Sequence, residues 1–221
     1  MKITLEQILL AGMHLGQPTQ IWNPKISIYT FGVRNNIRLI NLVKTRKGLK
    51  KARRFLRKRR GNGILFVGTK KKVVYAIKER AKFSKSLFVN NHWLGGMLTN
   101  WRTIKKSLLQ LYWIGREQSE RMWIIIKKKK VYWLRNRFNR LEKYFSGLKG
   151  IQKIPRVVVV VDQKVEIVSI QECCKLGIPV ICSLDTDCDP DLVELSVSIN
   201  DDSIKSIQVF LKNTRARIRE R

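Results

Sequence analysis

The chain has 221 residues, 44% hydrophobic and 28% charged, which fits one domain or one domain with an insertion and excludes a wholly disordered basic tail. Lys and Arg number 46 against 16 Asp and Glu, a net charge of +30. Residues 1–150 hold 36 basic and 5 acidic residues, whereas residues 151–221 hold 10 and 11. This excess calls for a polyanion, either nucleic acid or an anionic membrane surface.

Neither a membrane span nor a targeting segment is predicted. The longest strongly apolar runs, Val157–Val161 and Met122–Ile126, fall far short of the ~20 residues that cross a bilayer. The N-terminal residues resemble neither a signal peptide nor an Arg/Ser-rich transit peptide. We therefore expect a soluble protein without a membrane partner, made where it works or already processed.

The first sixty residues predict a short amphipathic helix, an extended basic loop, a strand and a second helix. The helix covers Leu5–Gly12, and the loop, rich in Gly, Pro and Asn, covers Met13–Asn36. The β-branched alternation of Ile37–Ile40 predicts the first strand of the main sheet. The helix that follows carries basic residues around an apolar face of Leu42, Leu49, Ala52 and Leu56.

Strands and helices then alternate. Predicted strands are Gly63–Gly68, Leu87–Val89, Val157–Val161 and Val180–Leu184, and predicted helices are Lys70–Lys82, Val165–Leu176 and a last helix with Ile204, Ile207, Leu211, Thr214 and Ile218 on one face. A valine run is typical of a strand buried on both faces. The rhythm predicts an α/β fold with a doubly wound parallel sheet.

A basic helical segment interrupts this alternation. Between Arg102 and Phe145 there is no proline and one glycine, and two apolar stripes recur at steps of three and four residues. We expect an inserted antiparallel coiled-coil hairpin. The expected division is 1–101 for the first part of the α/β domain, 102–147 for the hairpin and 148–221 for the second part.

A glycine turn with three lysines, Gly68-Thr69-Lys70-Lys71-Lys72, follows one strand and opens a helix, where doubly wound folds bind phosphate. It lacks the Lys-Ser/Thr order of a P-loop. Contact with an RNA phosphate is favoured over nucleotide hydrolysis. A plain turn with solvated lysines is as good an interpretation.

The one carboxylate cluster, Asp185 to Asp191, also follows a strand. Asp185 and Asp187 at a strand end can hold magnesium for phosphoryl transfer. The surrounding residues do not match a phosphohydrolase or a calcium loop, since Pro190 and Ser196 replace the required Gly and Glu. A turn whose aspartates cap backbone amides is favoured.

The histidines and cysteines do not form a catalytic or metal pattern. His14 and His92 stand alone, and no Ser or Cys lies in a nucleophile-elbow pattern. The cysteines show no Cys-x-x-Cys spacing, and we expect reduced thiols in a reducing compartment at Cys173, Cys174, Cys182 and Cys188. No metal or other cofactor is predicted.

Six tryptophans lie in the basic part, where aromatic and cationic side chains together can stack on unpaired bases and bind phosphate. For Trp113 and Trp133 we favour a structural role, covering the hairpin seam. For Trp22 and Trp93, RNA stacking and packing of a loop onto the sheet remain open.

Several strings together resemble one protein family. They are Trp22-Asn23-Pro24-Lys25, Leu65-Phe66-Val67-Gly68-Thr69-Lys70, the run from Val89 to Trp101 (VNNHWLGGMLTNW), and Leu176-Gly177-Ile178-Pro179 continuing to Asp185–Leu192. In order and spacing they resemble the second protein of the small ribosomal subunit in its bacterial and organellar form, from Ile3 to about Leu211, with the hairpin the least similar part.

The resemblance implies a flavodoxin-like sheet with a protruding coiled-coil hairpin, and a non-enzymatic role. It implies small-subunit rRNA and neighbouring ribosomal proteins as partners, a place near the exit of mRNA, and no small-molecule substrate. In bacteria the family also helps recruit the large mRNA-binding protein of the subunit. Details such as Val161-Asp162-Gln163 and Cys188 before Asp189 resemble plastid-encoded members, so we expect a plastid ribosome, ahead of a mitochondrial or bacterial one.

Three departures from the family pattern matter. His14-Leu15-Gly16-Gln17 replaces His-Phe-Gly-His, and Asn36–Asn41 replaces an acid with an amide and adds a cation. In the hairpin, Glu117, Glu120 and Glu142 are the only acids. The basic hairpin favours contact with RNA over the usual protein partner.

The sequence thus predicts a structural rRNA-binding component of the small subunit. The candidate RNA contacts are Trp22, Asn23, Lys25, Arg34, Lys70, Lys71, Lys72, Arg102, Lys105 and Lys106. Two alternatives stay open: a magnesium-dependent phosphotransferase that uses Asp185 and Asp187, and a free RNA chaperone.

Overall fold

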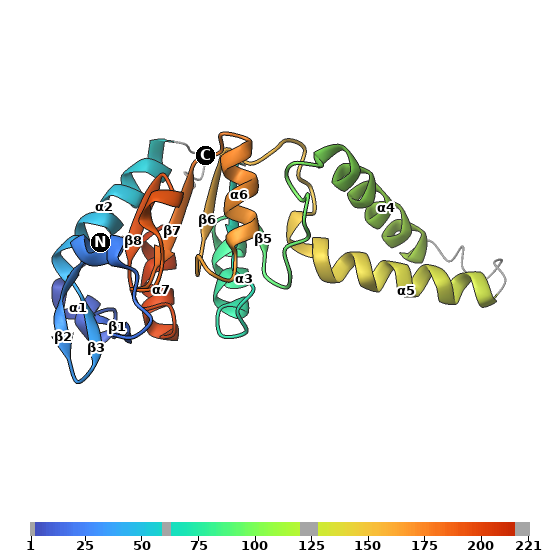
Figure 1. Ribbon diagram of the computed structural model, residues 1–221. Helices are drawn as coiled ribbons and strands as arrows, with labels where there is room; N and C mark the ends of the chain where they lie inside the picture. Colours follow the sequence, from blue (N-terminus) through green and yellow to red (C-terminus); the bar gives the residue numbers. More distant parts are fainter. Residues whose placement is uncertain (1–2, 59–62, 120–127, 215–221) are drawn as a thin grey trace.

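The computed structural model describes residues 3–58, 63–119 and 128–214. A parallel sheet with helices on both faces forms the body, a small antiparallel sheet lies at one end, and a pair of helices projects from the other (Figure 1).

The parallel sheet has five strands in the order β5-β4-β6-β7-β8. Their bounds are β4 Ile64–Val67, β5 Leu87–Val89, β6 Val157–Val160, β7 Val180–Leu184 and β8 Leu195–Ser198. Counted along the chain this is the 2-1-3-4-5 order of flavodoxin-like folds. Every residue of β4, β6 and β7 is buried, because helices or loops cover both faces. The predicted fold class is confirmed.

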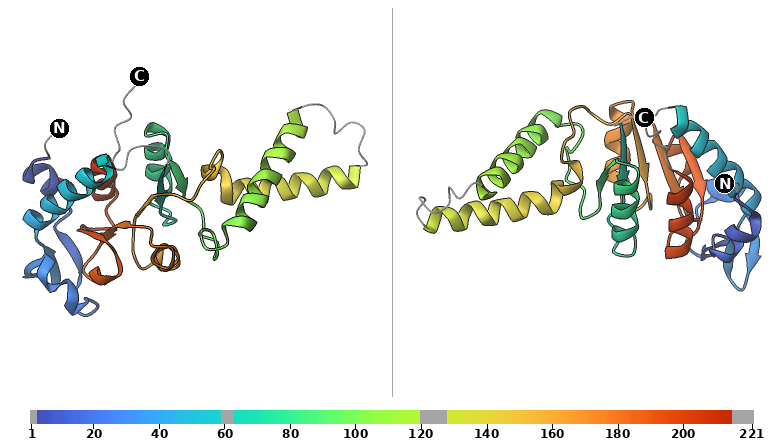
Figure 2. Two further views of the ribbon diagram at one scale, coloured as in Figure 1. Left: turned by 90° about the horizontal axis from the view of Figure 1, so that it is seen from above. Right: turned by 180° about the vertical axis from the view of Figure 1, so that it is seen from behind.

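The two faces of this sheet have separate apolar cores. On one face lie α2 (Leu42–Lys58), α3 (Val74–Phe83) and α7 (Ile204–Asn213), with α1 (Leu5–Leu10) at the margin. On the other lie α6 (Ile167–Lys175) and the 90–100 connection. Figure 2 shows the layers from above. The helix predicted from Lys70 begins at Val74 because residues 70–73 form a turn, closed by the Val73 amide on the Lys70 carbonyl.

The N-terminal segment corrects two predictions. Residues Ile37–Ile40 form β3, the central strand of an antiparallel sheet in the order β1-β3-β2, not the first strand of the main sheet. The expected loop contains β1 (Leu15–Pro18), a 3₁₀ helix (Pro24–Tyr29) and β2 (Thr30–Arg34). The physical reason is the Asn35-Asn36 turn, whose positive φ angles of 49° and 59° make the two-residue connection of a tight hairpin.

The projecting pair consists of α4 (Trp101–Ser119) and α5 (Lys128–Phe145), which lie between β5 and β6 in the chain; a short 3₁₀ turn (Ser146–Leu148) follows. The helices contact each other around Gly115, where an added Cβ would lie 3.2 Å from Phe138 Cε2. The two helices cross each other and do not run side by side, so a sustained coiled-coil seam is not confirmed (Figures 1 and 2). The division at 102 and 147 stays a prediction.

The hairpin tryptophans correct another expectation. Trp113 and Trp133 are 55% and 54% exposed, whereas Ile104, Leu111 and Leu134 are buried. Each residue step turns a helix by about 100°, which carries Trp113 away from the stripe that contains Leu111. The two tryptophans therefore do not cover the seam.

Within the three described segments, no helix is both long and apolar enough to cross a membrane. All four cysteines are free thiols, and burial raises the pKa of Cys173 to about 12. Unpaired thiols agree with the sequence prediction.

Candidate nucleic-acid interface

The predicted phosphate-binding turn lies between β4 and β6, where the strand order reverses and doubly wound folds bind ligands. Here the turn already holds an anion that belongs to the chain. The Thr69 amide donates to Glu166 Oε1 at 2.6 Å, and Glu166 is 2% exposed. Burial raises the pKa of Glu166, although its hydrogen bonds to Thr69 oppose the shift.

Lys70 is enclosed by carboxylates at the carboxyl ends of β6 and β8. Its Nζ lies 2.9 Å from Asp202 Oδ1, 3.2 Å from Asp162 Oδ2 and 3.5 Å from Asp201 Oδ1. Burial lowers the pKa of Lys70, but these three carboxylates outweigh it, so the net pKa is raised. The ammonium group thus neutralises charge inside the protein.

Asp185 and Asp201 are buried at this edge of the sheet, close to other aspartates. Burial raises the pKa of Asp185 to about 6 and that of Asp201 to about 7, and the charges of nearby aspartates add to both shifts. Asp185 is 1% exposed and accepts from the Thr186 amide at 2.6 Å.

The N-terminal segment closes the loop that follows β7. The backbone nitrogen of Gln17 donates to Thr186 Oγ1 at 2.9 Å, and its side-chain Nε2 donates to Asp202 Oδ2 at 2.9 Å. Gly16 fits because a Cβ there would lie 2.4 Å from Thr186 Cγ2 and 2.9 Å from the Arg38 carbonyl oxygen. This edge of the sheet is therefore packed against the chain's own residues.

The Asp185–Asp191 loop has the features of a capped turn. Asp189 accepts from the Asp191 amide at 3.0 Å, and Asp187 pairs with Lys164 at 2.7 Å. Across residues 3–58, 63–119 and 128–214, no three His, Cys, Asp or Glu side chains come together as a metal site. The geometry favours the capping interpretation over the magnesium one.

The first group of candidate RNA contacts is largely engaged within the protein. Trp22 lies under the Arg38 guanidinium, 3.2 Å from the ring centroid, and the Asn23 side chain accepts from the Lys25 amide. Lys25 pairs with Asp189 at 2.7 Å and with Asp191 at 3.0 Å, which raises its pKa. Arg34 is exposed beside the tight turn of the antiparallel sheet.

The run that carries the family resemblance is organised by one buried carboxylate. Glu172 accepts from Trp93 Nε1 at 2.9 Å and from the amides of Gly96, Leu98 and Thr99 at 2.8–3.0 Å. Burial would raise the pKa of Glu172, but these hydrogen bonds outweigh it and lower the pKa. Trp93, 6% exposed, therefore packs the loop onto the sheet, and Glu172 fixes the chain just before α4 begins.

The remaining candidates point outward. Lys71 and Lys72 are exposed in the turn, with Lys72 3.9 Å from Asp202. Arg102, Lys105 and Lys106, which we call the hairpin base, are exposed on α4. Within the described part of the chain, no acidic group forms an ion pair with Lys71 or with the hairpin base.

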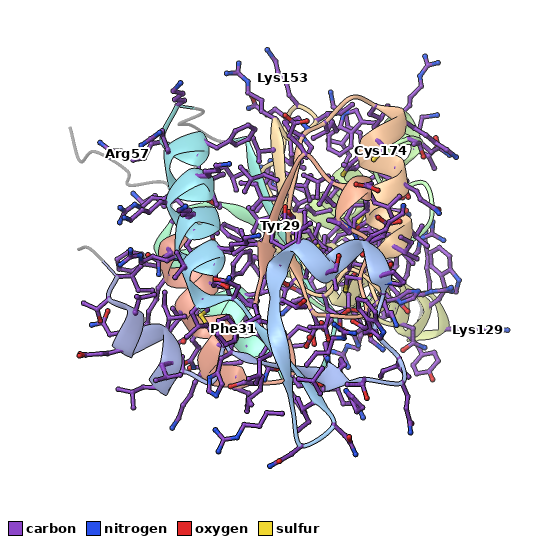
Figure 3. All side chains as sticks on the ribbon, turned by 60° about the vertical axis from the view of Figure 1, so that its left-hand side comes forward. Tyr29, Phe31, Arg57, Lys129, Lys153 and Cys174 are labelled. Atoms are coloured by element: carbon purple, nitrogen blue, oxygen red, sulfur yellow. The ribbon has the colours of Figure 1, made fainter. Side chains whose placement is uncertain are left out.

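A second basic surface lies on α2 and was not among the predicted contacts. We call it the α2 basic face; its exposed cations are Lys47, Lys50, Lys51, Arg54, Arg57 and Lys58. Among the described residues they have no acidic partner, and α2 itself contains no acid. The sequence could have indicated this surface, because the predicted helix has cations on every side except its apolar stripe. Figure 3 shows Arg57 on α2 pointing away from the body, far from Lys129.

The protein is thus a flavodoxin-like α/β protein in which the chain's own side chains occupy the edge of the sheet that usually binds ligands. Its cations without acidic partners include the hairpin base and the α2 basic face. The family model for Ribosomal protein S2 matches residues 8–220. The chain therefore belongs to the ribosomal protein S2 family.

Curated relatives cover nearly the whole chain. It is 41% identical over 213 residues to "Small ribosomal subunit protein uS2c" of Trieres chinensis, covering 96% of this chain and 93% of that protein. It is 44% identical over 213 residues to "Small ribosomal subunit protein uS2" of Microcystis aeruginosa, covering 95% and 80%. It is 41% identical over 211 residues to the uS2c protein of Porphyra purpurea, covering 95% and 88%. Plastid and cyanobacterial proteins are both among these relatives.

Proposed function

We propose that this chain is a structural constituent of the small ribosomal subunit that binds rRNA through the hairpin base, Lys71 and the α2 basic face. The observation that carries the proposal is the distribution of charge: Lys25 and Lys70 at the sheet edge have acidic partners, while the cations of the hairpin base and of the α2 basic face have none among the described residues. Each unpaired cation placed on a phosphate releases counterions and favours binding.

Family membership makes the role structural, not enzymatic. Similarity to the uS2c proteins of Trieres chinensis and Porphyra purpurea supports a plastid ribosome as the place of function, with cyanobacterial uS2 proteins also similar. Neighbouring ribosomal proteins are expected partners. The neutral C-terminal third, whose excess charge is close to zero, offers them a surface free of the repulsion between basic proteins.

A test compares three triple variants of the full chain in binding to small-subunit rRNA at several salt concentrations. The α2 triple replaces Lys50, Lys51 and Arg54 with Gln, and the hairpin triple replaces Arg102, Lys105 and Lys106. The control replaces Lys153, Lys175 and Lys205, which are equally exposed but lie in the neutral third. We expect the first two to reduce the salt slope by about two to three units each and the control to leave it unchanged.

Equal slopes in all three variants would refute the assigned surfaces. A sucrose gradient of lysate from the native source tests the cellular role. The chain should sediment with the small subunit and stay there through a high-salt wash. A position at the top of the gradient would instead favour the free RNA chaperone.

Contact with mRNA is a finer part of the proposal. The family resemblance implies a place near the mRNA exit, and the α2 basic face is a candidate surface for a passing strand. Crosslinking of intact subunits carrying photoreactive mRNA should label this chain, and the amount of label should decrease in the α2 triple variant. If the chain is present in the subunit but is not labelled, mRNA is not one of the chain's partners.

A further inference from the structure

A hollow lies on the flank of α5, on the projecting pair of helices. Its volume is about 380 Å³, and its lining comprises Trp133, Asn136, Arg137, Arg140 and Leu141. These positions are spaced three and four residues apart, so they share one side of the helix. The volume falls in the range of small-ligand sites.

Trp133 forms an unusual wall for a surface hollow. Trp133 is 54% exposed, and the Arg137 guanidinium lies over its ring, 5.3 Å from the centroid. Arg137 also donates to Gln110 Oε1 of α4 at 2.9 Å, so both helices hold the guanidinium in place. The result is an exposed indole with a fixed guanidinium over one face of its ring.

The charge of the hollow is uncompensated. Among the residues that the structure describes, none that lines the hollow is acidic, and Arg140 has no acidic partner. Glu142, the acid nearest in sequence, is paired with Lys149 at 2.6 Å. The ligand that complements the hollow has both a negative charge and a flat ring.

We propose that this hollow seats one unpaired nucleotide of RNA. The base stacks on the face of the Trp133 indole that Arg137 does not cover, the Asn136 amide faces the edge of the base, and Arg140 binds the adjacent phosphate. The inference rests on the proposed function, since it names a particular contact within RNA binding. It requires a single strand, because an A-form duplex keeps its bases stacked inside.

An acidic protein segment satisfies the cations of the hollow but leaves the indole without a flat partner. Base stacking on an aromatic side chain contributes about 1–3 kcal/mol per base, which an acidic segment does not gain. The nucleotide therefore fits both elements of the site, and the acidic segment fits one.

The test measures binding of the full chain to a ~10-nucleotide oligoadenylate, a length within the site sizes of single-strand binders. Trp133→Ala should weaken binding about 10-fold or more without changing the salt slope, and Trp133→Phe should retain most of it. Arg140→Gln should reduce the slope by about 0.7 units. Both residues are exposed, so these variants should fold, which circular dichroism checks.

Matched controls lie on the same two helices. Trp113 is as exposed as Trp133, at 55% against 54%, but lies outside the hollow. Trp113→Ala should bind the oligonucleotide like the wild type. Arg135 is exposed on α5 and does not line the hollow, so Arg135→Gln should keep the slope.

Equal loss in the Trp113 and Trp133 variants, or no loss in either, would overturn the site. Retention of the oligonucleotide with loss of a ribosomal protein in the Trp133 variant would assign the hollow to protein and also overturn the proposal. Binding of small-subunit rRNA by the wild type separates the two claims: if it persists while Trp133 proves irrelevant, only the nucleotide site fails. If the wild type does not bind rRNA, the proposed function fails as well.

Discussion

The carboxyl edge of the sheet and the projecting helices use positive charge in opposite ways. At the sheet edge, Lys70 lies within 3.5 Å of three aspartates and Lys25 within 3.0 Å of two. On α4 and α5, cations such as Lys105 and Arg140 have no acidic partner within the described part of the chain. The net charge of +30 therefore does not describe either region by itself. The cations of the sheet edge are already paired with aspartates, whereas those of the projecting helices are available to a polyanion.

This protein also differs from the usual ligand-binding proteins of its fold. Flavodoxin-like sheets bind ligands beyond the carboxyl ends of their strands, near the switch point. Here Glu166 accepts the hydrogen bond of the Thr69 amide in the phosphate turn. Gln17 Nε2 donates to Asp185 Oδ2 at 3.4 Å and to Asp202 Oδ2 at 2.9 Å. The edge where such folds bind ligands is therefore occupied by the chain's own side chains, and the proposed RNA contacts lie elsewhere.

The largest expected effect tests the internal role of Lys70. Lys70→Ala leaves Asp162, Asp201 and Asp202 without their common cation, and we expect the free energy of unfolding to fall by about 3–5 kcal/mol at neutral pH. The deficit should shrink at lower pH, where the aspartates take up protons. Urea denaturation measures both.

Lys71→Ala is the matched control, since it removes the same charge one residue away. It should leave the free energy of unfolding within about 0.5 kcal/mol of the wild type and weaken rRNA binding only modestly. If Lys70→Ala weakens RNA binding more than Lys71→Ala at equal stability, the sheet edge binds RNA after all, and the contrast drawn above is wrong.

Glu172 offers the next largest effect. Glu172→Gln keeps the shape but turns a donor toward part of the 93–99 loop, whose amides need an acceptor. We expect a loss of about 2 kcal/mol in the free energy of unfolding. Hydrogen exchange at the Leu98 and Thr99 amides should become faster.

A surface carboxylate provides the comparison for Glu172. Among the residues that the structure describes, Glu142 accepts only from the exposed Lys149, and Glu142→Gln should cost less than about 1 kcal/mol. Equal costs for the two substitutions, or unchanged exchange in the loop, would show that Glu172 does not organise the approach to α4.

The buried aspartates predict an unusual dependence of stability on pH. With pKa values raised to about 6 and about 7, Asp185 and Asp201 bind protons more tightly in the folded than in the unfolded chain. The free energy of unfolding should therefore fall by about 4 kcal/mol as the pH rises from about 5 to about 8. Below about pH 4 it should fall again, because Asp189, Asp202 and Glu172 have lowered pKa values.

The variant that isolates this effect is Asp201→Asn, which keeps the shape and removes one titrating group. It should flatten the decline between pH ~5 and ~8 while leaving the acid limb in place. A decline equally steep in the variant would assign the proton uptake to other groups.

Local sequence signals predicted the parallel sheet because a valine run and apolar strands followed by helix patterns need no distant information. The hairpin of β2 and β3 was missed, although Asn35-Asn36 is a local turn signal. Helical spacing located α4 and α5, but the way they cross depends on packing at their bases, which spacing does not encode.

The candidate site divides along the same line. Exposed cations on α2 and α4 are visible in a helical pattern. The pairing of Lys70 with aspartates is not visible in such a pattern. Asp201 is 131 positions away along the chain, and it approaches Lys70 only when β4 and β8 belong to one sheet. A lysine in a glycine turn looks the same in the sequence whether its partner is RNA or a buried aspartate.

The smallest expected effect compares two exposed lysines that differ in their partners. Lys25 is paired with Asp189 and Asp191, whereas Lys51 on α2 has no acidic partner among residues the structure describes. Lys51→Gln should reduce the salt slope of rRNA binding by about 0.9 units, one phosphate contact. Lys25→Gln should leave the slope unchanged, because its charge is already neutralised by two carboxylates. The same slope for both would mean that Lys25 exchanges its aspartates for phosphate on the ribosome, and that pairing within the free protein does not decide which cations RNA can use.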